Sequence, residues 1–170
     1  MSANNYLPHL LVLPEDDANR QILVGFRNHH AVNFRKMDVQ NIAGGWLVAV
    51  KLVKDEHVPL MRKFPKRHVL LVIDFDGHSE RRDQILSEIP AELKSRFYIL
   101  SCSDEPEALL ASLASTGIRA EEGSKLETLG KRLATDCDQN TNETWGHDML
   151  AHNATELERL KTNVKDFLFS

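Results

Sequence analysis

The sequence VLLVIDFDG at positions 69–77 decides the fold. Its first five residues are valine, leucine or isoleucine, and such a continuous run is typical of a strand buried on both faces, as in parallel sheets. Two carboxylates, Asp74 and Asp76, follow the run directly, and Gly77 allows the chain to bend after them. The stretch therefore predicts a central parallel strand that carries carboxylates at its C-terminal end.

Strand and helix patterns alternate on both sides of this run. Apolar runs predict strands at 9–13, 33–39 and 97–100. Helical spacing predicts helices at about 17–26, 46–62, 83–93 and 105–113, the third interrupted near Pro90. In the second helix we expect one face to hold Leu47, Val50, Val53 and Leu60. The alternation indicates βαβ units, so we expect an α/β fold with a Rossmann-like parallel sheet of about four strands flanked by helices.

The C-terminal third has a helical pattern. Two capping-box patterns, at 124–127 and 155–158, each predict the start of a helix. An apolar stripe on the last helix should pack across the sheet or against a second subunit, and its residues are Leu157, Leu160, Val164 and Leu168. We therefore expect one domain over residues 1–170, with a core at about 7–113 and a helical extension at about 117–170.

Composition limits the classes of function. No apolar run is long enough to cross a membrane, and the N-terminus lacks the features of a signal peptide, so we expect a cytoplasmic protein. The two cysteines, Cys102 and Cys137, lack the spacing of a zinc site and are expected to be reduced thiols. A net charge of −4 argues against binding nucleic acid by bulk electrostatics, so any contact with it must be local.

Acidic residues follow three of the four predicted strands. Glu15, Asp16 and Asp17 follow the first strand, Asp74 and Asp76 the third, and Asp104, Glu105 and Glu107 the fourth. Ligands of open α/β sheets bind at this edge, and clustered carboxylates repel one another unless a cation is present. Mg²⁺ prefers such oxygen ligands. The pattern predicts a divalent metal site.

Several of these residues also have a purely structural interpretation. Asp17 can cap the first helix, and Asp104 with Glu107 can cap the helix that contains Pro106. Arg81 and Arg82 follow the Asp-x-Asp loop and are candidates to bind phosphate, although an exposed helix face explains them almost as well. His147 and His152 are five residues apart, which does not fit a two-histidine zinc site on a helix.

Taken together, these motifs resemble the Toprim domain, and most closely its OLD-like and small stand-alone nucleases. The family pattern is a strand ending in glutamate and a later strand ending in Asp-x-Asp. It is matched here by the segments ending at Glu15 and Asp76, and the resemblance covers about residues 7–113. Gly44 and Gly45 also match, as does an acidic residue, Glu105 or Glu107, at the helix after the fourth strand. Either Glu15 or Asp16 fits the glutamate position.

The resemblance implies metal-dependent hydrolysis of DNA or RNA. Glu15, Asp74 and Asp76 would be catalytic and would bind Mg²⁺ or Mn²⁺, with Glu105 and Glu107 as further metal ligands and with Arg81 and Arg82 binding nucleic acid. Glu15 would act as general acid or base, or as ligand of a second metal. The family association further suggests a nuclease-like subunit of a larger assembly, or a homodimer, in antiviral defence.

Two other functions fit part of the pattern. The run ending in Asp74-Phe-Asp76-Gly77 also matches the motif of haloacid-dehalogenase-type phosphatases, but there the motif normally lies on the first strand. The acidic start after the first strand resembles a receiver-like regulatory domain, in which Asp74 would be the phosphoacceptor and Lys125 a candidate partner. The long spacing between the acidic clusters counts against this alternative.

Overall fold

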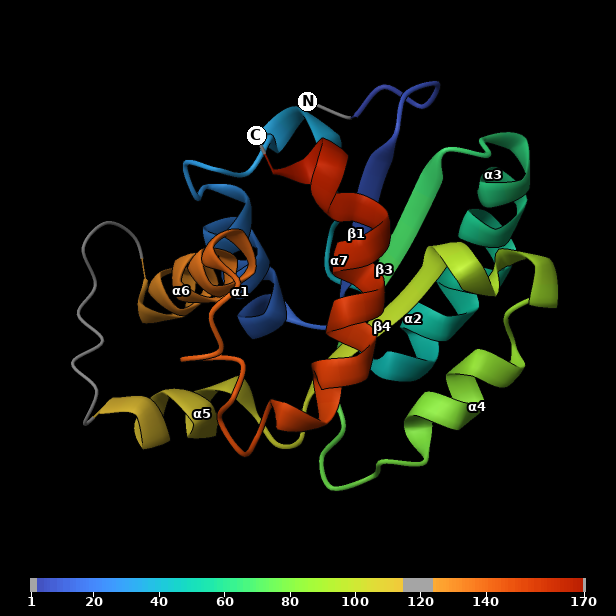
Figure 1. Cartoon of the computed structure of the whole chain (residues 1–170). Helices are drawn as coiled ribbons and strands as arrows, with labels where there is room; N and C mark the ends of the chain where they lie inside the picture. The colour runs from blue at the N-terminus through green and yellow to red at the C-terminus, as the bar shows by residue number, and fades with distance from the viewer. Residues whose placement is uncertain (1–2, 115–123, 170) are drawn as a thin grey trace.

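A parallel four-stranded sheet forms the centre of the computed structural model, which describes residues 3–114 and 124–169 (Figure 1). The strand order is β2-β1-β3-β4. The strands are β1 (His9–Pro14), β2 (Met37–Val39), β3 (Arg67–Asp74) and β4 (Phe97–Cys102). The predicted α/β fold with a Rossmann-like parallel sheet is thus confirmed, and the 69–73 run lies in β3 between two neighbours.

Both faces of the sheet are covered, which is why β3 is apolar at successive residues. Leu70 faces one core, and Val69, Leu71 and Ile73 face the other. The first core packs against four helices: α1 (Asp17–Arg27), α5 (Pro106–Leu113), α6 (Lys125–Gln139) and α7 (Ala154–Leu168). The apolar stripe expected on the last helix is buried in this core, so it packs on the sheet (Figure 1).

The second core packs against the helical segments between β2 and β4. These are α2 (Trp46–Leu52), a π-helical turn (Val53–His57), α3 (Val58–Lys63), α4 (Arg81–Ser87) and a 3-10 helix (Ala91–Arg96). The helix predicted at 46–62 therefore exists, but the expected buried face is wrong at Leu47, which is 65% exposed. Val53 faces the core as predicted, and Ala49 rather than Leu47 does so before it. The π turn adds a residue and shifts the phase after it, so Met61 rather than Leu60 faces the core.

Three other boundaries differ from expectation. The strand predicted at 33–39 is a 3-10 turn (Phe34–Lys36), capped by Asn33, followed by the three residues of β2. The helix predicted at 83–93 is interrupted near Pro90 as expected, but its two parts span Arg81–Ser87 and Ala91–Arg96. The 124–127 capping box is confirmed, since the Ser124 side chain accepts from the Glu127 N–H at 3.2 Å, but α7 begins before Thr155.

Side chains of α7 and of Asn153, the residue before it, cover the outer edge of β4. Asn153 Oδ1 accepts from the Ser101 N–H at 3.0 Å, and Asn153 Nδ2 donates to the Ser101 carbonyl at 2.7 Å. Glu156 Oε1 accepts from the Ile99 N–H at 2.9 Å, and Arg159 donates to the Phe97 carbonyl. An edge strand otherwise presents such groups to other chains. Helix α7 thus takes the place of a fifth strand.

Helices α1 and α6 approach each other closely at two glycines. A Cβ added to Gly25 would lie 1.9 Å from the Glu127 carbonyl oxygen, and one added to Gly130 would lie 1.9 Å from the Ile22 carbonyl oxygen. Both obstacles are backbone atoms, which side-chain rotation cannot move. The glycines therefore set the distance between these helices, and α6 follows α1 along the same side of the sheet (Figure 1).

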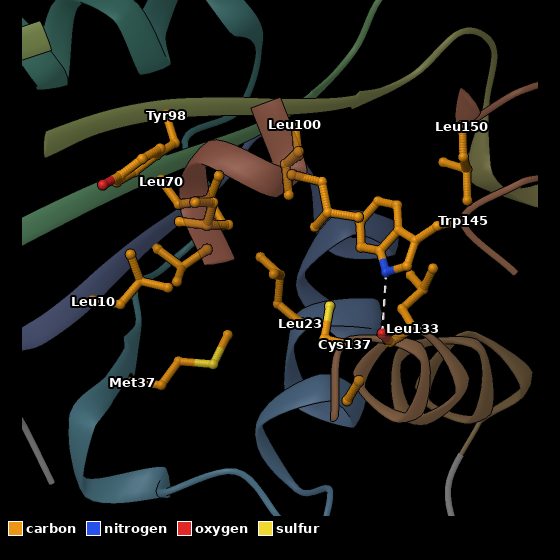
Figure 2. Close-up of a cluster of buried hydrophobic side chains, with 14 of the residues drawn as sticks. Leu10, Leu23, Met37, Leu70, Tyr98, Leu100, Leu133, Cys137, Trp145 and Leu150 are labelled. Atoms are coloured by element: carbon orange, nitrogen blue, oxygen red, sulfur yellow. Dashed lines mark hydrogen bonds between the residues drawn. The ribbon is translucent and has the colours of Figure 1, made fainter. Parts of the chain in front are cut away.

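A cavity of about 80 Å³ lies inside the first core, between the sheet and helices α1, α6 and α7. Figure 2 shows the apolar side chains around it, with Trp145 fixed by a hydrogen bond from its Nε1 to the Leu133 carbonyl at 3.1 Å. Cys102 and Cys137 are buried in the same core as free thiols. Within the described ranges, no helix is both long enough and apolar enough to span a membrane.

Replacing Gly130 with alanine should destabilise the fold, although alanine is the better helix former by about 1 kcal/mol. Overpacking against backbone costs about 1–3 kcal/mol or more, so we expect a net loss of about 2 kcal/mol in the free energy of unfolding. Urea denaturation of Gly130→Ala measures it, with Gln139→Ala at an exposed position of α6 as control. A variant as stable as wild type would show that the helix contact is not tight.

Replacing Asn153 with alanine should leave the Ser101 N–H and carbonyl of β4 without these partners. Each buried polar group that loses its partner costs about 1–3 kcal/mol, so Asn153→Ala should lower the free energy of unfolding by at least about 2 kcal/mol. Thr155→Ala is the matched control, because Thr155 is exposed and does not cap α7. Equal losses in the two variants would contradict the role of Asn153 at the edge of β4.

Candidate active site

The acidic residues meet where the strand order changes direction. From β1 the chain moves to β2 on one side of the sheet and then to β3 on the other side. The chain therefore leaves β1 and β3 toward opposite sides of the sheet, and in open α/β sheets ligands bind beside such a point, at the C-terminal ends of the strands. Glu15 follows β1 directly, and Asp74 is the last residue of β3.

Glu15 links the two strands through its side chain. Its Oε2 accepts from the Asp74 N–H at 2.9 Å, and its backbone N–H donates to the Val72 carbonyl at 3.0 Å. The Glu15 carbonyl accepts from the Gly44 N–H at 3.0 Å, which ties the loop after β2 to the site. Gly44 and Gly45 have φ of 86° and 129°, a region that favours glycine, so the glycine pair has a conformational cause.

Asp16, and not Asp17, caps α1. Its Oδ1 accepts from the Asn19 N–H at 2.8 Å and from Asn19 Nδ2 at 3.0 Å. The same Nδ2 donates to Asp74 Oδ1 at 3.3 Å, so a buried asparagine bridges the carboxylates of β1 and β3. Sequence reasoning missed Asn19. Asn19 lies three residues after the N-cap and on the buried side of α1, and this position could have indicated that its side chain bonds to the site.

Arg81 neutralises the outer part of the cluster. One guanidinium nitrogen donates to the Asp76 carboxylate and to the Asp74 carbonyl, both at 2.8 Å. The guanidinium carbon lies 5.2 Å from the centre of the Trp46 ring, which holds the side chain in place. Asp76 itself adopts φ of 49°, so the turn aims its carboxylate back toward this arginine.

The electrostatics of the cluster favour uptake of positive charge. Burial raises the pKa of Asp74 to about 8, helped by the nearby charges of Asp16, Glu15 and Asp76 and opposed by the Asn19 hydrogen bond. Burial likewise raises the pKa of Glu15, and Asp16 and Asp76 add to the effect, while the Asp74 N–H and Arg81 oppose it. A proton or a metal cation would relieve the same repulsion.

The remaining predicted site residues lie apart from these bonds. Arg82 faces the buried Glu156 at 3.5 Å, although an approach to phosphate was expected of it. Glu105 occupies the N-cap position of α5 and Glu107 its first turn, and both are exposed. Asp104 accepts from the Glu105 N–H at 2.9 Å. Within the described part of the chain, no hydrogen bond or ion pair joins Glu105 or Glu107 to the carboxylates at the ends of β1 and β3, which are those of Glu15, Asp16, Asp74 and Asp76.

The donor set agrees with Mg²⁺ in chemistry and charge. Each of Glu15, Asp16, Asp74 and Asp76 uses one carboxylate oxygen in the bonds above, and no hydrogen bond to another described residue engages its second oxygen. Oxygen atoms are the ligands that this ion prefers. Within residues 3–114 and 124–169, however, no group of three or more His, Cys, Asp or Glu side chains is already arranged to hold a metal. Binding would therefore require side chains to rotate.

Comparison with known proteins yields no relative. No family model, no curated protein and no solved structure matches this chain. The geometry of the site is therefore the evidence from which its function is inferred.

The stability of the metal-free protein should fall as pH rises toward and past 8. Because the folded pKa of Asp74 is about 8 and its unfolded value is near 4, the folded state holds this proton more tightly. The stabilisation is complete below pH 4 and is lost as pH rises through 8. Asp74→Asn should remove this loss, so its stability relative to wild type should rise by a few kcal/mol between pH 5 and 9.

Urea denaturation in EDTA at several pH values measures this difference. Asp166→Asn, at an exposed position near the end of α7, should keep the wild-type dependence on pH. Parallel curves for wild type and Asp74→Asn would mean that Asp74 does not carry the raised pKa.

Proposed function

We propose that this chain is a Mg²⁺- or Mn²⁺-dependent hydrolase of phosphodiester bonds in nucleic acid. The observation that supports it most is the convergence of four carboxylates at the point where the strand order changes direction. Three hydrogen bonds support it: Glu15 accepts from the Asp74 N–H, and Asn19 Nδ2 donates to both Asp16 and Asp74. A strongly acidic cluster beside Arg81 suits a divalent cation together with a phosphate group.

A divalent ion held by Asp74 and Asp76, with Asp16 nearby, would stabilise the charge that develops on the phosphate. Glu15 is suited to move a proton, because its raised pKa brings the carboxyl closer to neutral pH. Its Oε2 is oriented by the Asp74 N–H, which leaves Oε1 to face a reacting group. We therefore assign the role of the motif's glutamate to Glu15 rather than to Asp16, because the Asp16 side chain caps α1.

Arg81 is the residue that we assign to the phosphate. Its guanidinium has five N–H donors, and the bonds to Asp74 and Asp76 come from one nitrogen. A phosphate oxygen can replace the Asp76 carboxylate as acceptor, which would also release Asp76 for the cation. Farther from the cluster, Arg82 remains a candidate to bind nucleic acid, and Glu105 and Glu107 remain candidates to bind metal. With a net charge of −4, the contact with DNA or RNA would be confined to the surface around this cluster.

The Toprim resemblance supports the same reaction, since its glutamate and Asp-x-Asp motifs are the segments that meet here. The nuclease-like subunit, the larger assembly or homodimer, and the antiviral setting are proposals that rest on this resemblance alone.

A phosphoacceptor domain is the second candidate, and the strand order favours it. The order β2-β1-β3-β4 is the start of the doubly wound 2-1-3-4-5 order found in receiver domains, with an acidic strand end beside the acceptor position of Asp74. Asp74 is only 6% exposed and bonded to Asn19, which hinders attack by its carboxylate on a phosphoryl group. The same argument applies to a phosphatase that uses Asp74 as its nucleophile.

The test is cleavage of plasmid, single-stranded DNA and RNA with Mn²⁺. Wild type should cleave at least one substrate, and Asp74→Ala and Glu15→Gln should each be at least about 100-fold slower, as expected on losing a charged or acid–base group of the site. Asp166→Asn is the control for a lost carboxylate elsewhere and should cleave at the wild-type rate. Identical behaviour of wild type and Asp74→Ala would remove the enzymatic proposal.

Two further measurements separate the candidates. Mn²⁺ at pH 8 should raise the melting temperature of wild type and not that of Asp74→Asn, because the cation binds the ionised cluster of the folded state. Incubation with acetyl phosphate followed by mass spectrometry tests the alternatives. A covalent phosphate on Asp74, without cleavage of any nucleic acid, would favour the phosphoacceptor role.

A further inference from the structure

A polar hollow lies at the C-terminal end of α1, opposite the end that Asp16 caps. It has a volume of about 500 Å³ and is lined by the end of α1, the segment that follows, and α6. Its lining residues are Arg27, Asn28, His29, His30, Val32, Phe34, Glu127 and Lys131. Since α1 has 11 residues and rises 1.5 Å per residue, its two ends are about 16 Å apart, so the hollow is separate from the carboxylate site at Asp16.

The described lining of the hollow has an excess of positive charge. It contains two cations, Arg27 and Lys131, and one carboxylate, Glu127. Arg27 Nε is buried and has no hydrogen-bond partner among the residues that the structure describes. Within the described residues, neither cation forms an ion pair. A buried donor without an acceptor costs about 1–3 kcal/mol, so the described part of the chain leaves this guanidinium short of an acceptor.

The helix end does not account for Arg27. A cation near a helix C-terminus commonly bonds to its last carbonyls. Here the Val24 carbonyl accepts from the Asn28 N–H, the Phe26 carbonyl from His29, and the His29 carbonyl from Val32. These acceptors are satisfied by the backbone, and the guanidinium remains available.

His29 forms a neutral wall of the hollow. Its Nδ1 accepts from the Ala31 N–H at 3.3 Å, so the proton of the neutral ring lies on Nε2, which donates to Thr135 Oγ1 at 3.1 Å. Both nitrogens are therefore engaged, and burial lowers the pKa of this ring. The positive charge that the described lining keeps at neutral pH therefore comes from Arg27 and Lys131.

We infer that this hollow binds a phosphate-type oxyanion, with Arg27 and Lys131 as its cationic ligands. An arginine supplies a planar pair of N–H donors and a lysine a point charge, the combination that tetrahedral oxyanions accept. The volume falls within the range of small-molecule sites and leaves room for a group attached to the phosphate. Phe34, 55% exposed on the lining, provides an apolar surface for such a group. The phosphate belongs either to a free metabolite or to a nucleic-acid strand.

Calorimetric titration with pyrophosphate, in EDTA and at low ionic strength, tests the inference. Wild type should bind, and Arg27→Gln and Lys131→Gln should each weaken binding at least about tenfold, as expected for the loss of a charged hydrogen-bond donor. Lys66→Gln makes the same change of charge at an exposed position outside the hollow and should bind like wild type. Arg27→Lys should retain part of the affinity, which separates a lost ligand from a damaged fold.

Wild type that does not bind pyrophosphate, or Arg27→Gln that binds as tightly as wild type, would overturn the inference. Asp74→Asn should keep full affinity, so the outcome is independent of the proposed hydrolase. Fluorescence anisotropy with a labelled single-stranded oligonucleotide identifies the source of the phosphate. If Arg27→Gln weakens oligonucleotide binding and pyrophosphate competes with it, the phosphate is that of a strand. If only pyrophosphate binding is affected, the ligand is a free phosphate compound.

Discussion

The parallel pairing of β1 with β3 is the constraint on which the rest of the molecule depends. Pro14 pairs with Val72, so Glu15 continues the register opposite Ile73. In a regular parallel ladder the Asp74 N–H would bond to the Glu15 carbonyl, but that carbonyl accepts from Gly44. The Glu15 carboxylate replaces it. A side chain thus completes the hydrogen bonding of the sheet, and acidic strand ends 59 residues apart in the chain meet there.

The architecture was predictable because its main signals are local. A continuous apolar run requires cover on both faces, and the alternation of strand and helix patterns then leads to a parallel sheet. Errors arose where tertiary contacts override local pattern. Thr155 has the form of a helix cap, but α7 begins at Ala154, and the residue at its N-cap, Asn153, bonds through its side chain to β4 instead of capping the helix. The π turn before Pro59 shifted the buried face of its helix, and periodicity that assumes 3.6 residues per turn cannot detect such an insertion.

The carboxylates of the site were easier to predict than their partners. Glu15, Asp74 and Asp76 stand at strand ends, and strand ends can be read from hydrophobicity. The roles of Asn19 and Arg81 depend on where helices lie in space, and Arg82 differs from its neighbour only in the direction of its side chain. Arg81 therefore turns toward Asp76, while Arg82 turns toward Glu156, which also holds the edge of β4. Of these two adjacent residues, Arg81 thus contacts the candidate site, and Arg82 contacts a residue that stabilises the fold.

The void between the sheet and helices α1, α6 and α7 has a mechanical consequence. Glycines hold α1 and α6 in backbone contact, so these helices cannot shift to fill the space beside them. When the chain unfolds, water reaches the surfaces that enclosed the void, and the total volume of protein and solvent falls, for proteins generally by about 20–100 mL/mol. We therefore expect the half of the molecule that contains the void to be the more compressible one under hydrostatic pressure.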